Sequence, residues 1–404
     1  MVKRVAIVRL LNYSRDMLVQ REAEALHSLG FDVDVFCVRH DEPAEEVIDS
    51  IRVHHLPLRR KKRGAARNLY EYFAFFFLVA LRLTTAHLRR PFSVIQVNSM
   101  PDFLVFATLI PRLLGAKVTL QMYEPMPELW QTRFKASLPI TLLKRIEQWS
   151  LRYAHVAFTV TQQLKDRFVS RGADPDKITV VLNAPDPHLF KTAPPPATSS
   201  VGNCFTLICH GAIEERYGHD TMLQAIAAIR SSAPGLRLRI LGDGGYQDEF
   251  LARVEAMGLQ AQVEYLGFLP LDRLVVELSQ ADVGIVAQRA SPYSHLVHTG
   301  KMYDYLAFGK PIIASRLQAV QAYFSEDSLC FFTPGDADDL ARAMLDLYRQ
   351  PDKRRVLVEN SQKLYEQYTW EKQKEIYLSV YRALLDLSDV PQLTGSVAAD
   401  RGAA

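Results

Sequence analysis

Short apolar runs rich in β-branched residues recur along the chain, and segments with the periodicity of an amphipathic helix lie between them. A run of this kind fits a buried strand, and a helix between two such strands is typical of a parallel sheet. The alternation therefore predicts a doubly wound α/β fold. In the first half, the predicted strands are residues 4–10, 33–38, 94–97, 118–122 and 156–160, with helices such as 18–29 and 103–114 between them.

The alternation stops at residues 185–203, which are rich in Pro, Ser and Thr and show no periodic pattern. This composition is typical of a linker between domains. Beyond it the same pattern begins again and predicts a second domain at residues 204–369, after a first domain at residues 1–190. Its predicted strands are residues 205–209, 236–241, 263–266, 283–287 and 311–314, and a last helix is expected at 370–388 before a disordered tail at 389–404.

Composition supports two domains and argues against some functions. The chain has 404 residues and an apolar share of 48%, enough for two cores. Its 48 Lys and Arg nearly balance its 45 Asp and Glu, so the net charge of +3 gives no case for nucleic-acid binding. The charge is unevenly placed, because residues 52–90 contain ten Lys or Arg and a single acid, Glu71. One face is therefore expected to be basic.

The cysteines and the longest apolar stretch indicate a cytosolic protein. Cys37, Cys204, Cys209 and Cys330 lie in strand-like runs without metal-site spacing, which predicts buried, reduced thiols. The first residues do not have the pattern of a signal peptide. The apolar stretch at residues 73–81 is about half as long as a membrane-spanning helix, so no such helix is expected.

The segment 299–315, TGKMYDYLAFGKPIIAS, predicts a helix, a tight turn and a buried strand. Gly300 and Lys301 would open the helix, where free N–H groups and the helix dipole favour an anion such as a diphosphate. Asp304 lies one turn later on the same face, in reach of a ribose hydroxyl or of Lys301 itself. The alternative is a capped surface helix that binds no ligand.

This segment resembles glycosyltransferase family 4, whose second domain carries the signature P-N-K-x-x-E-Y-x-A-x-G-x-P-V-V-A. The resemblance implies that Lys301 holds the phosphates of a nucleotide-sugar donor and that Asp304 binds its ribose. It also places His298, Thr299 and Gly300 in the donor site. The family often has a Glu near the transferred sugar at the position of Leu296, for which either His295 or His298 is the candidate substitute.

A second segment, HGAIEERYGHD at residues 210–220, directly follows a predicted strand. The family's equivalent loop commonly has Arg-Lys-Gly, whose cations clamp the donor diphosphate. The likeness assigns Arg216 and Gly211 to the donor site, with Tyr217 in place of the usual Lys. The alternative for Arg216 is a surface ion pair with Glu214 or Glu215.

A glycine-rich turn, LGDGG, follows the next predicted strand of the second domain. Gly242 and Gly244 lack side chains and would permit the close approach of a ligand. We therefore include both in the predicted donor site.

The first domain resembles the same family, and the likeness extends over roughly residues 3–387. Relatives often have His followed by Asp or Glu beside the sugar-transfer site, where this chain has Tyr123 and Glu124. A tyrosine donates a hydrogen bond but does not shuttle protons near neutral pH as imidazole does. Tyr123 and Glu124, with Arg216 and Lys301, are the catalytic candidates. Glu124 or Glu128 is expected to bind the acceptor, and the alternative for both is a helix-capping role.

A basic run precedes a strongly apolar predicted helix at residues 69–83. Lys and Arg next to aromatic side chains suit an anionic membrane surface. The alternative is a helix buried on the sheet behind a solvated loop, and the two combine if the loop alone touches lipid. The run consists of Arg59, Arg60, Lys61, Lys62 and Arg63.

Taken together, the resemblance implies a GT-B fold, with two Rossmann-like domains facing each other across a cleft and the last helix returning to the first domain. The family transfers sugar with retention of configuration and usually needs no metal, and here Arg216 and Lys301 would supply the neutralising charge. The expected acceptor is lipid-linked or a polysaccharide, reached from the inner face of the cell membrane. A sugar-nucleotide 2-epimerase and a non-catalytic partner subunit are the alternatives.

Overall fold

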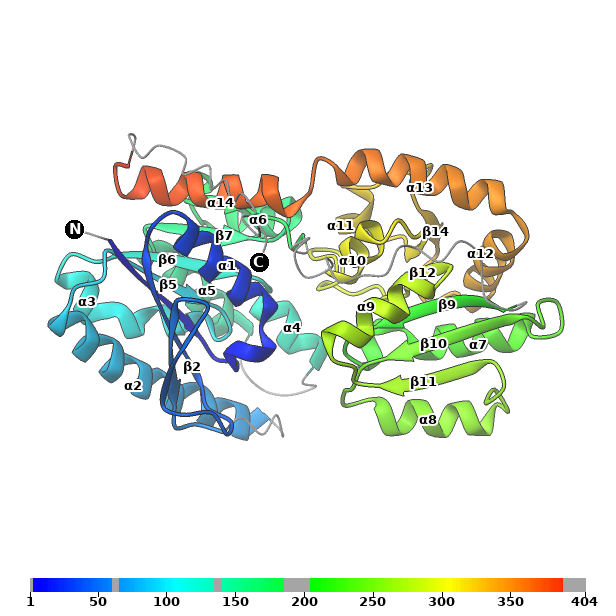
Figure 1. The fold of residues 1–404 in the computed structure, drawn as a ribbon, viewed down its shortest axis with the longest axis horizontal. Helices are drawn as coiled ribbons and strands as arrows, with labels where there is room; N and C mark the ends of the chain where they lie inside the picture. The colour runs from blue at the N-terminus through cyan, green and yellow to red at the C-terminus, as the bar shows by residue number, and fades with distance from the viewer. Residues whose placement is uncertain (1–2, 60–64, 134–139, 185–203, 388–404) are drawn as a thin grey trace, which may run out of the picture. The chain divides into compact units, whose positions relative to one another are not determined.

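The computed structural model describes the chain except for residues 1–2, 60–64, 134–139, 185–203 and 388–404 (Figure 1). The chain forms two compact units. Unit 1 comprises Met1–Asn98, Leu104–Thr119 and Lys374–Ala404, and unit 2 comprises Ser99–Phe103 and Leu120–Gln373. The predicted linker and tail lie outside the described residues, so the predicted domain boundaries stay predictions.

The described strands before the linker form one sheet in the order β3-β4-β2-β1-β5-β6-β7-β8. β1 pairs in parallel with β2 and with β5, whereas β3 is antiparallel to β4. Val5 to Val8 of β1 are fully buried, as expected for a central strand covered on both faces. The strands are β1 (Arg4–Arg9), β2 (Asp32–Val38), β3 (Glu45–Ile48), β4 (Ile51–Leu56), β5 (Val94–Asn98), β6 (Lys117–Met122), β7 (Val156–Thr159) and β8 (Ile178–Val180).

The helices before the linker differ from the sequence prediction in two places. The predicted helix at 103–114 is a 3-10 segment, Asp102–Thr108, followed by a short α3. The predicted helix at 69–83 is longer, since α2 spans 25 residues and packs on β2 and β4. The helices are α1 (Met17–Ser28), α2 (Ala65–Arg89), α3 (Leu109–Leu113), α4 (Met126–Arg133), α5 (Ile140–Tyr153) and α6 (Gln162–Ser170).

Helix α2 corrects the expectation drawn from residues 73–81. The described part of the chain contains one helix, Ala66–Arg89, that is long enough and apolar enough to cross a membrane, judged by length and composition alone. The helix is longer than the apolar stretch at residues 73–81 because a charged residue before that stretch does not end it. In the structure, Glu71 is buried and pairs with Arg67 one turn earlier, so its charge does not end the helix.

The strands after the linker form a second sheet in the order β11-β10-β9-β12-β13-β14, and every neighbouring pair is parallel. The order reverses direction between β9 and β12. In an open α/β sheet, ligands bind beyond the carboxyl ends of the strands at such a reversal. The strands are β9 (Phe205–His210), β10 (Leu236–Leu241), β11 (Val263–Gly267), β12 (Val283–Val286), β13 (Ile312–Ser315) and β14 (Cys330–Phe332).

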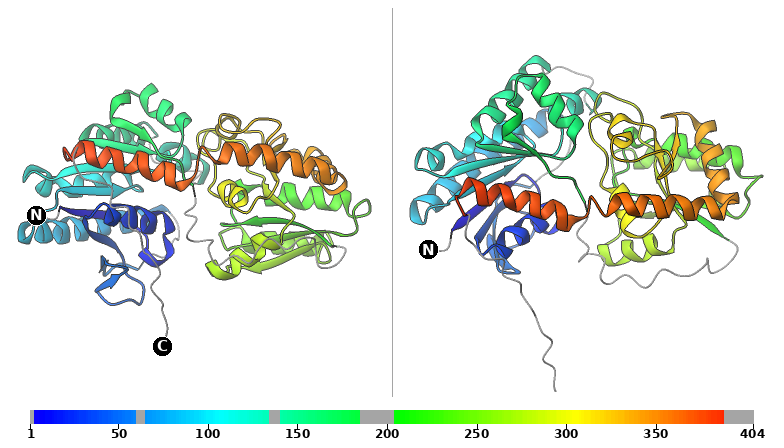
Figure 2. Two further views of the ribbon diagram at one scale, coloured as in Figure 1. Left: turned by 45° about the horizontal axis from the view of Figure 1, so that its top comes forward. Right: turned by 90° about the horizontal axis from the view of Figure 1, so that it is seen from above.

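Helices cover both faces of this second sheet (Figure 2). One hydrophobic core contains side chains of α7, α8 and α12, and another contains side chains of α9, α10 and α11. The predicted doubly wound architecture is therefore confirmed. The helices are α7 (His219–Ile229), α8 (Gln247–Ala256), α9 (Leu271–Gln280), α10 (Lys301–Ala307), α11 (Gln318–Gln321), α12 (Ala337–Arg349) and α13 (Pro351–Tyr365).

The predicted last helix is present, and three of the four cysteines are buried. α14 (Trp370–Leu384) begins in unit 2 and continues in unit 1. Cys37, Cys209 and Cys330 are buried free thiols, as predicted, but Cys204 is only half-buried because it precedes the first residue of β9.

Candidate functional site

The loops that follow the neighbouring strands β9 and β10 approach each other, and the loop after β9 lies beside the reversal of strand order between β9 and β12. A Cβ atom on Gly242 would lie 2.0 Å from the carbonyl oxygen of Gly211, and one on Gly244 would lie 2.1 Å from that of Ile213. Gly242 also has a backbone φ of +127°, which residues other than glycine rarely adopt. The two glycines thus allow contact between loops, whereas their predicted contact with a ligand stays a prediction.

Lys301 lies over the first of these loops. It is the first residue of α10, with Gly300 as N-cap, so the predicted helix start is confirmed. Its backbone N–H donates to Oγ1 of Thr299 over 3.1 Å. A Cβ atom on Gly211 would lie 2.7 Å from Cε of Lys301, so the side chain passes directly across the glycine.

Arg216 reaches the same place from the 3-10 segment Glu215–Tyr217. Its guanidinium carbon lies 5.0 Å from the ring centre of Tyr217, and Nζ of Lys301 lies 4.3 Å from that centre. The structure therefore brings Arg216 and Lys301 to one aromatic ring, although 85 positions separate them in the sequence. Glu215, a predicted alternative partner of Arg216, instead pairs with Arg289 at 2.8 Å.

The surroundings of Arg216 keep its guanidinium charged. Burial opposes the charge, but the rings of Tyr217 and Tyr293 and the carboxylate of Glu124 outweigh that effect and raise the pKa of Arg216. Nε of Arg216 is buried and has no hydrogen-bond partner among the described residues. An unmatched, desolvated donor of this kind favours binding of an anion.

Asp304 contacts a residue that the sequence did not single out. Oδ2 of Asp304 lies 3.1 Å from Nε2 of His210, the last residue of β9. The imidazole of His210 stacks on the ring of Tyr305, with centroids 5.1 Å apart. Burial, and then the charge of Lys301, lower the pKa of His210 to about 3, so the ring is neutral near pH 7. A neutral imidazole can donate one hydrogen bond to Asp304 and orient its carboxylate.

The residues just before α10 are mostly interior. Nε2 of His298 lies 2.8 Å from the hydroxyl of Tyr303, and its ring also contacts Tyr323. Burial lowers the pKa of His298 to about 4, which is the environment of a core histidine. Leu296 is buried as well, whereas His295 is half-exposed and accepts the N–H of Gln318.

The candidates from the segment after β6 have different surroundings. Tyr123 is buried. Within unit 2, the hydroxyl of Tyr293 hydrogen-bonds Glu124, and burial followed by the Glu124 charge raises the pKa of Tyr293 well above its usual value. The guanidinium of Arg216 lies 5.1 Å from the centre of the Tyr293 ring. Tyr293 therefore contacts both Arg216 and Glu124, two of the predicted catalytic residues.

Glu128 belongs to a buried cluster of charges. Its carboxylate pairs with Arg171, which also donates to Glu147 over 2.8 Å. Burial raises the pKa of Glu147 to about 7. These ion pairs give Glu128 a structural role, and its predicted contact with an acceptor stays a prediction.

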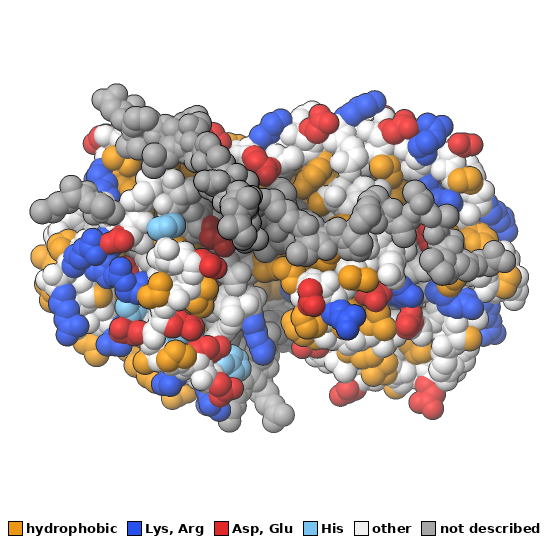
Figure 3. Space-filling model, viewed as in Figure 1, with side chains coloured by type: hydrophobic (Ala, Val, Ile, Leu, Met, Phe, Trp, Pro, Cys, Tyr) orange, Lys and Arg blue, Asp and Glu red, His pale blue; other side chains and the backbone are white. Residues whose placement is uncertain are grey.

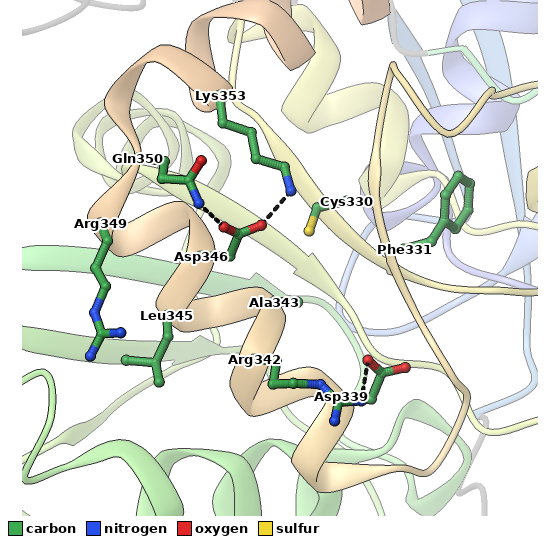
Figure 4. Close-up of a pocket in the computed structure, with 10 residues that line it drawn as sticks. All are labelled: Cys330, Phe331, Asp339, Arg342, Ala343, Leu345, Asp346, Arg349, Gln350 and Lys353. Carbon is green, nitrogen blue, oxygen red and sulfur yellow. Dashed lines mark hydrogen bonds and ion pairs between the residues drawn. The ribbon is translucent and has the colours of Figure 1, made fainter.

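A separate pocket of about 460 Å³ lies where α12, α13 and the start of β14 meet (Figure 4). Its two carboxylates are already engaged, since Arg342 donates to Asp339 and both Lys353 and Gln350 donate to Asp346. The pocket contains none of the predicted site residues. We therefore place the candidate site at the loops after β9 and β10 and at the first turn of α10.

The structure describes one residue of the predicted basic run, Arg59. Arg59 is exposed and pairs with Asp41 at 2.7 Å. Arg60, Lys61, Lys62 and Arg63 lie outside the described residues.

Two family models match most of the chain. Residues 18–184 match a glycosyl transferase 4-like domain, and residues 196–364 match the glycosyl transferases group 1 domain. The division between the two models falls in the predicted linker.

Curated relatives resemble part of the chain. It is 27% identical over 225 residues to a D-inositol 3-phosphate glycosyltransferase of Rhodococcus erythropolis, covering 52% of this chain and 49% of that protein. It is 26% identical over 258 residues to a 2-deoxystreptamine glucosyltransferase of Streptomyces kanamyceticus, covering 59% and 64%. The chain thus spans about half to two thirds of the length of these relatives.

Solved structures resemble nearly the whole chain. A sucrose-phosphate synthase from Thermosynechococcus elongatus has a TM-score of 0.77 at 18% identity, covering 96% of this chain and 100% of that one. Anabaena HepE in complex with UDP and glucose has a TM-score of 0.71 at 17% identity, covering 94% and 98%. At these identities the likeness concerns the fold.

Proposed function

Because the chain belongs to the family 4-like glycosyltransferases of the GT-B fold, we propose that it moves a sugar from a nucleoside-diphosphate sugar to a lipid-linked or polysaccharide acceptor, with retention of configuration. The observation that carries the proposal is the convergence of Arg216 and Lys301 on the ring of Tyr217. HepE, a protein of similar fold, binds UDP and glucose, which agrees with such a donor.

The two cations suit the charge changes of the proposed reaction. When the bond between the sugar and the diphosphate breaks, the diphosphate leaves with additional negative charge. Arg216 and Lys301 are already in place, so they stabilise that charge without reorganising. We propose that they replace a divalent metal in this role.

Asp304 and the glycine-rich loops complete the proposed donor site. We assign the ribose hydroxyls to Asp304, whose carboxylate is held by neutral His210 at 3.1 Å. Gly211 leaves the backbone beside Lys301 open, since it is exposed and carries no side chain. Glu124 and Tyr293 lie near Arg216 and are the proposed contacts of the sugar.

Replacing Lys301 tests the donor site. We expect Lys301→Ala to lower sugar transfer by roughly tenfold to a hundredfold, because a charge-assisted contact is worth about 1.5–3 kcal/mol. Arg216→Ala should act in the same way. Isothermal titration with UDP, GDP and ADP measures the binding loss, and the thermal midpoint of the unliganded variant should stay near that of the parent.

Arg349→Ala is the matched control, because it removes an exposed cation beside the other pocket. If Lys301→Ala binds the nucleoside diphosphates as tightly as the parent, the donor assignment is wrong. Incubating the parent with donor and candidate acceptors also separates the alternatives: isomerised donor indicates an epimerase, and unchanged donor indicates a non-catalytic subunit.

A further inference from the structure

Helix α2 has a second apolar face that faces solvent. Its exposed large side chains are spaced as one stripe of a helix. A helix on the surface of a soluble protein normally has polar residues there, and contiguous apolar patches mark binding surfaces. The stripe consists of Tyr70, Phe73, Phe77, Leu81 and Leu88, which are 58%, 48%, 67%, 65% and 65% exposed.

The opposite face of α2 is fixed to the protein. Tyr72, Phe75, Val79 and Leu83 are buried, and the helix packs against β2 and β4. A bilayer-spanning helix would have to leave this sheet and expose those four side chains. Because its inner face is packed on the sheet, α2 can offer only its outer face to a partner. This face is about 37 Å long, since the helix has 25 residues.

Helix α3 extends the apolar surface. It contacts α2, and its large side chains Leu109, Ile110 and Leu113, with Leu114 after it, are also exposed. We call these four residues and the α2 stripe the α2–α3 face. Figure 3 shows hydrophobic and basic side chains beside one another at the left edge of unit 1, with acidic side chains among them toward its lower part.

The exposed charges that α2 and the residue directly after it contribute to the α2–α3 face are positive. Arg82, Arg89 and Arg90 are exposed on or directly after α2. The acid of α2, Glu71, is buried and neutralised by Arg67. Arg82 and Arg90 form exposed ion pairs with Glu45 and Asp32, which are worth little in water and exchange readily for other anions.

We propose that the α2–α3 face lies in the headgroup layer of an anionic membrane, with the apolar stripe at the boundary of the acyl chains. Exposed aromatic and leucine side chains flanked by arginines are the chemistry that such an interface binds. A second copy of the chain fits less well, because α2 of that copy would offer no exposed carboxylate to pair with the arginines, since its one acid, Glu71, is buried. This inference deepens the lipid-linked acceptor of the proposed function and does not depend on the donor site.

Vesicle flotation of the full chain tests the surface. The vesicles contain phosphatidylcholine either alone or mixed with phosphatidylglycerol. We expect the parent to float with the anionic vesicles, and added salt to weaken binding. The double variant Phe77→Ser/Leu81→Ser should bind roughly tenfold to a hundredfold more weakly, because two large side chains no longer leave water. The control Phe268→Ser removes an equally exposed phenylalanine, 70% exposed in unit 2, and should bind as the parent does.

Three further measurements make the result decisive. Arg89→Glu should weaken binding to the anionic vesicles and leave binding to pure phosphatidylcholine unchanged. Because it keeps the apolar stripe intact, it also tests the proposal if the double variant does not fold. UDP binding by the double variant should equal that of the parent, because the α2–α3 face is not part of the donor site. A parent that binds vesicles but not UDP would contradict the donor assignment and leave the membrane proposal standing. Unchanged flotation of both variants, or a parent dimer in gel filtration that the double variant loses, would overturn the membrane proposal.

Discussion

At the scale of single residues, the ring of Tyr217 contacts the two cations of the candidate site, Arg216 and Lys301. Arg216 and Lys301 repel each other in the absence of an anion, yet both contact the ring of Tyr217. The negative face of an aromatic ring attracts cations, so the ring offsets part of that repulsion. Tyr217 stands where related proteins commonly have a lysine, and here its ring positions the two cations.

Tyr217→Phe and Tyr217→Leu separate the ring from its hydroxyl. The phenylalanine variant keeps the ring and should bind nucleoside diphosphate nearly as the parent does. The leucine variant loses both cation–π contacts, and we expect roughly fivefold weaker binding or more. Titration calorimetry with UDP measures both. Equal loss in the two variants would show that the hydroxyl, which lies 3.4 Å from Nη2 of Arg216, matters instead.

Asp102 gives a prediction about pH. Its side chain is fully buried, and neither carboxyl oxygen has a hydrogen-bond partner among the described residues. Burial, and then the charge of Glu147, raise its pKa well above 3.8, so the folded protein holds the neutral acid. The unfolded chain ionises above about pH 3.8, and each higher pH unit therefore favours unfolding by about 1.4 kcal/mol, up to the folded pKa.

Asp102→Asn removes this titration with little change of shape. We expect a higher thermal midpoint than the parent at pH 8 and a difference that shrinks toward pH 4.5. Calorimetric scans across this range measure it. A difference that is constant with pH would mean that Asp102 is charged in the folded protein.

At the scale of elements, contact between the loops after β9 and β10 shapes the candidate site. In Gly242→Ala the new methyl group would meet the carbonyl of Gly211, which requires the loops to separate. Gly258→Ala is the matched control, because Gly258 also has a positive φ, +63°, but has nothing within 4 Å. The control carries backbone strain alone, about 1–2 kcal/mol.

We expect Gly242→Ala to lower the free energy of unfolding by clearly more than Gly258→Ala and to weaken UDP binding, whereas Gly258→Ala leaves binding unchanged. Chemical denaturation and titration with UDP give the two quantities. Similar losses of stability in both variants would show that backbone strain, rather than contact between the loops, accounts for the glycine.

The same scale shows what could be predicted from the sequence. Strands such as β1 and β9 were recognised because unbroken apolar runs fit buried parallel strands. β4 was missed because it contains His54 and His55, whose imidazoles contact Asp34 and Glu46 at 2.8 and 2.7 Å and are not exposed to water. A sequence pattern does not show which polar residues find partners.

The candidate site follows the same rule. The convergence of Arg216 and Lys301 was predictable, because each is a basic residue that follows a strand of the same sheet. His210 and Tyr293 were not assigned a role, since their roles depend on Asp304 and Glu124, which lie 94 and 169 positions away. The signal for His210 was its place as the last residue of a strand, directly before a glycine.

At the scale of the whole molecule, α14 begins in unit 2 and continues in unit 1. In unit 1 its hydroxyl groups enter a buried polar network. Tyr377 and Tyr381 both donate to Oε1 of Gln96 in β5, over 2.7 and 2.5 Å. Nε2 of Gln96 in turn donates to Glu22 of α1 over 2.7 Å. The network fixes α14 to the sheet of unit 1.

The double variant Tyr377→Phe/Tyr381→Phe tests this attachment. It leaves Oε1 of Gln96 buried without its two donors, and an unsatisfied buried acceptor costs about 1–3 kcal/mol. We expect the free energy of unfolding to fall by roughly that amount, while UDP binding is retained because Arg216, Lys301 and Asp304 all belong to unit 2. Tyr70→Phe, which removes an exposed hydroxyl, is the control and should melt as the parent does. If the double variant also melts as the parent does, the hydroxyl groups of α14 contribute nothing, and the packing of its rings alone holds the helix on unit 1.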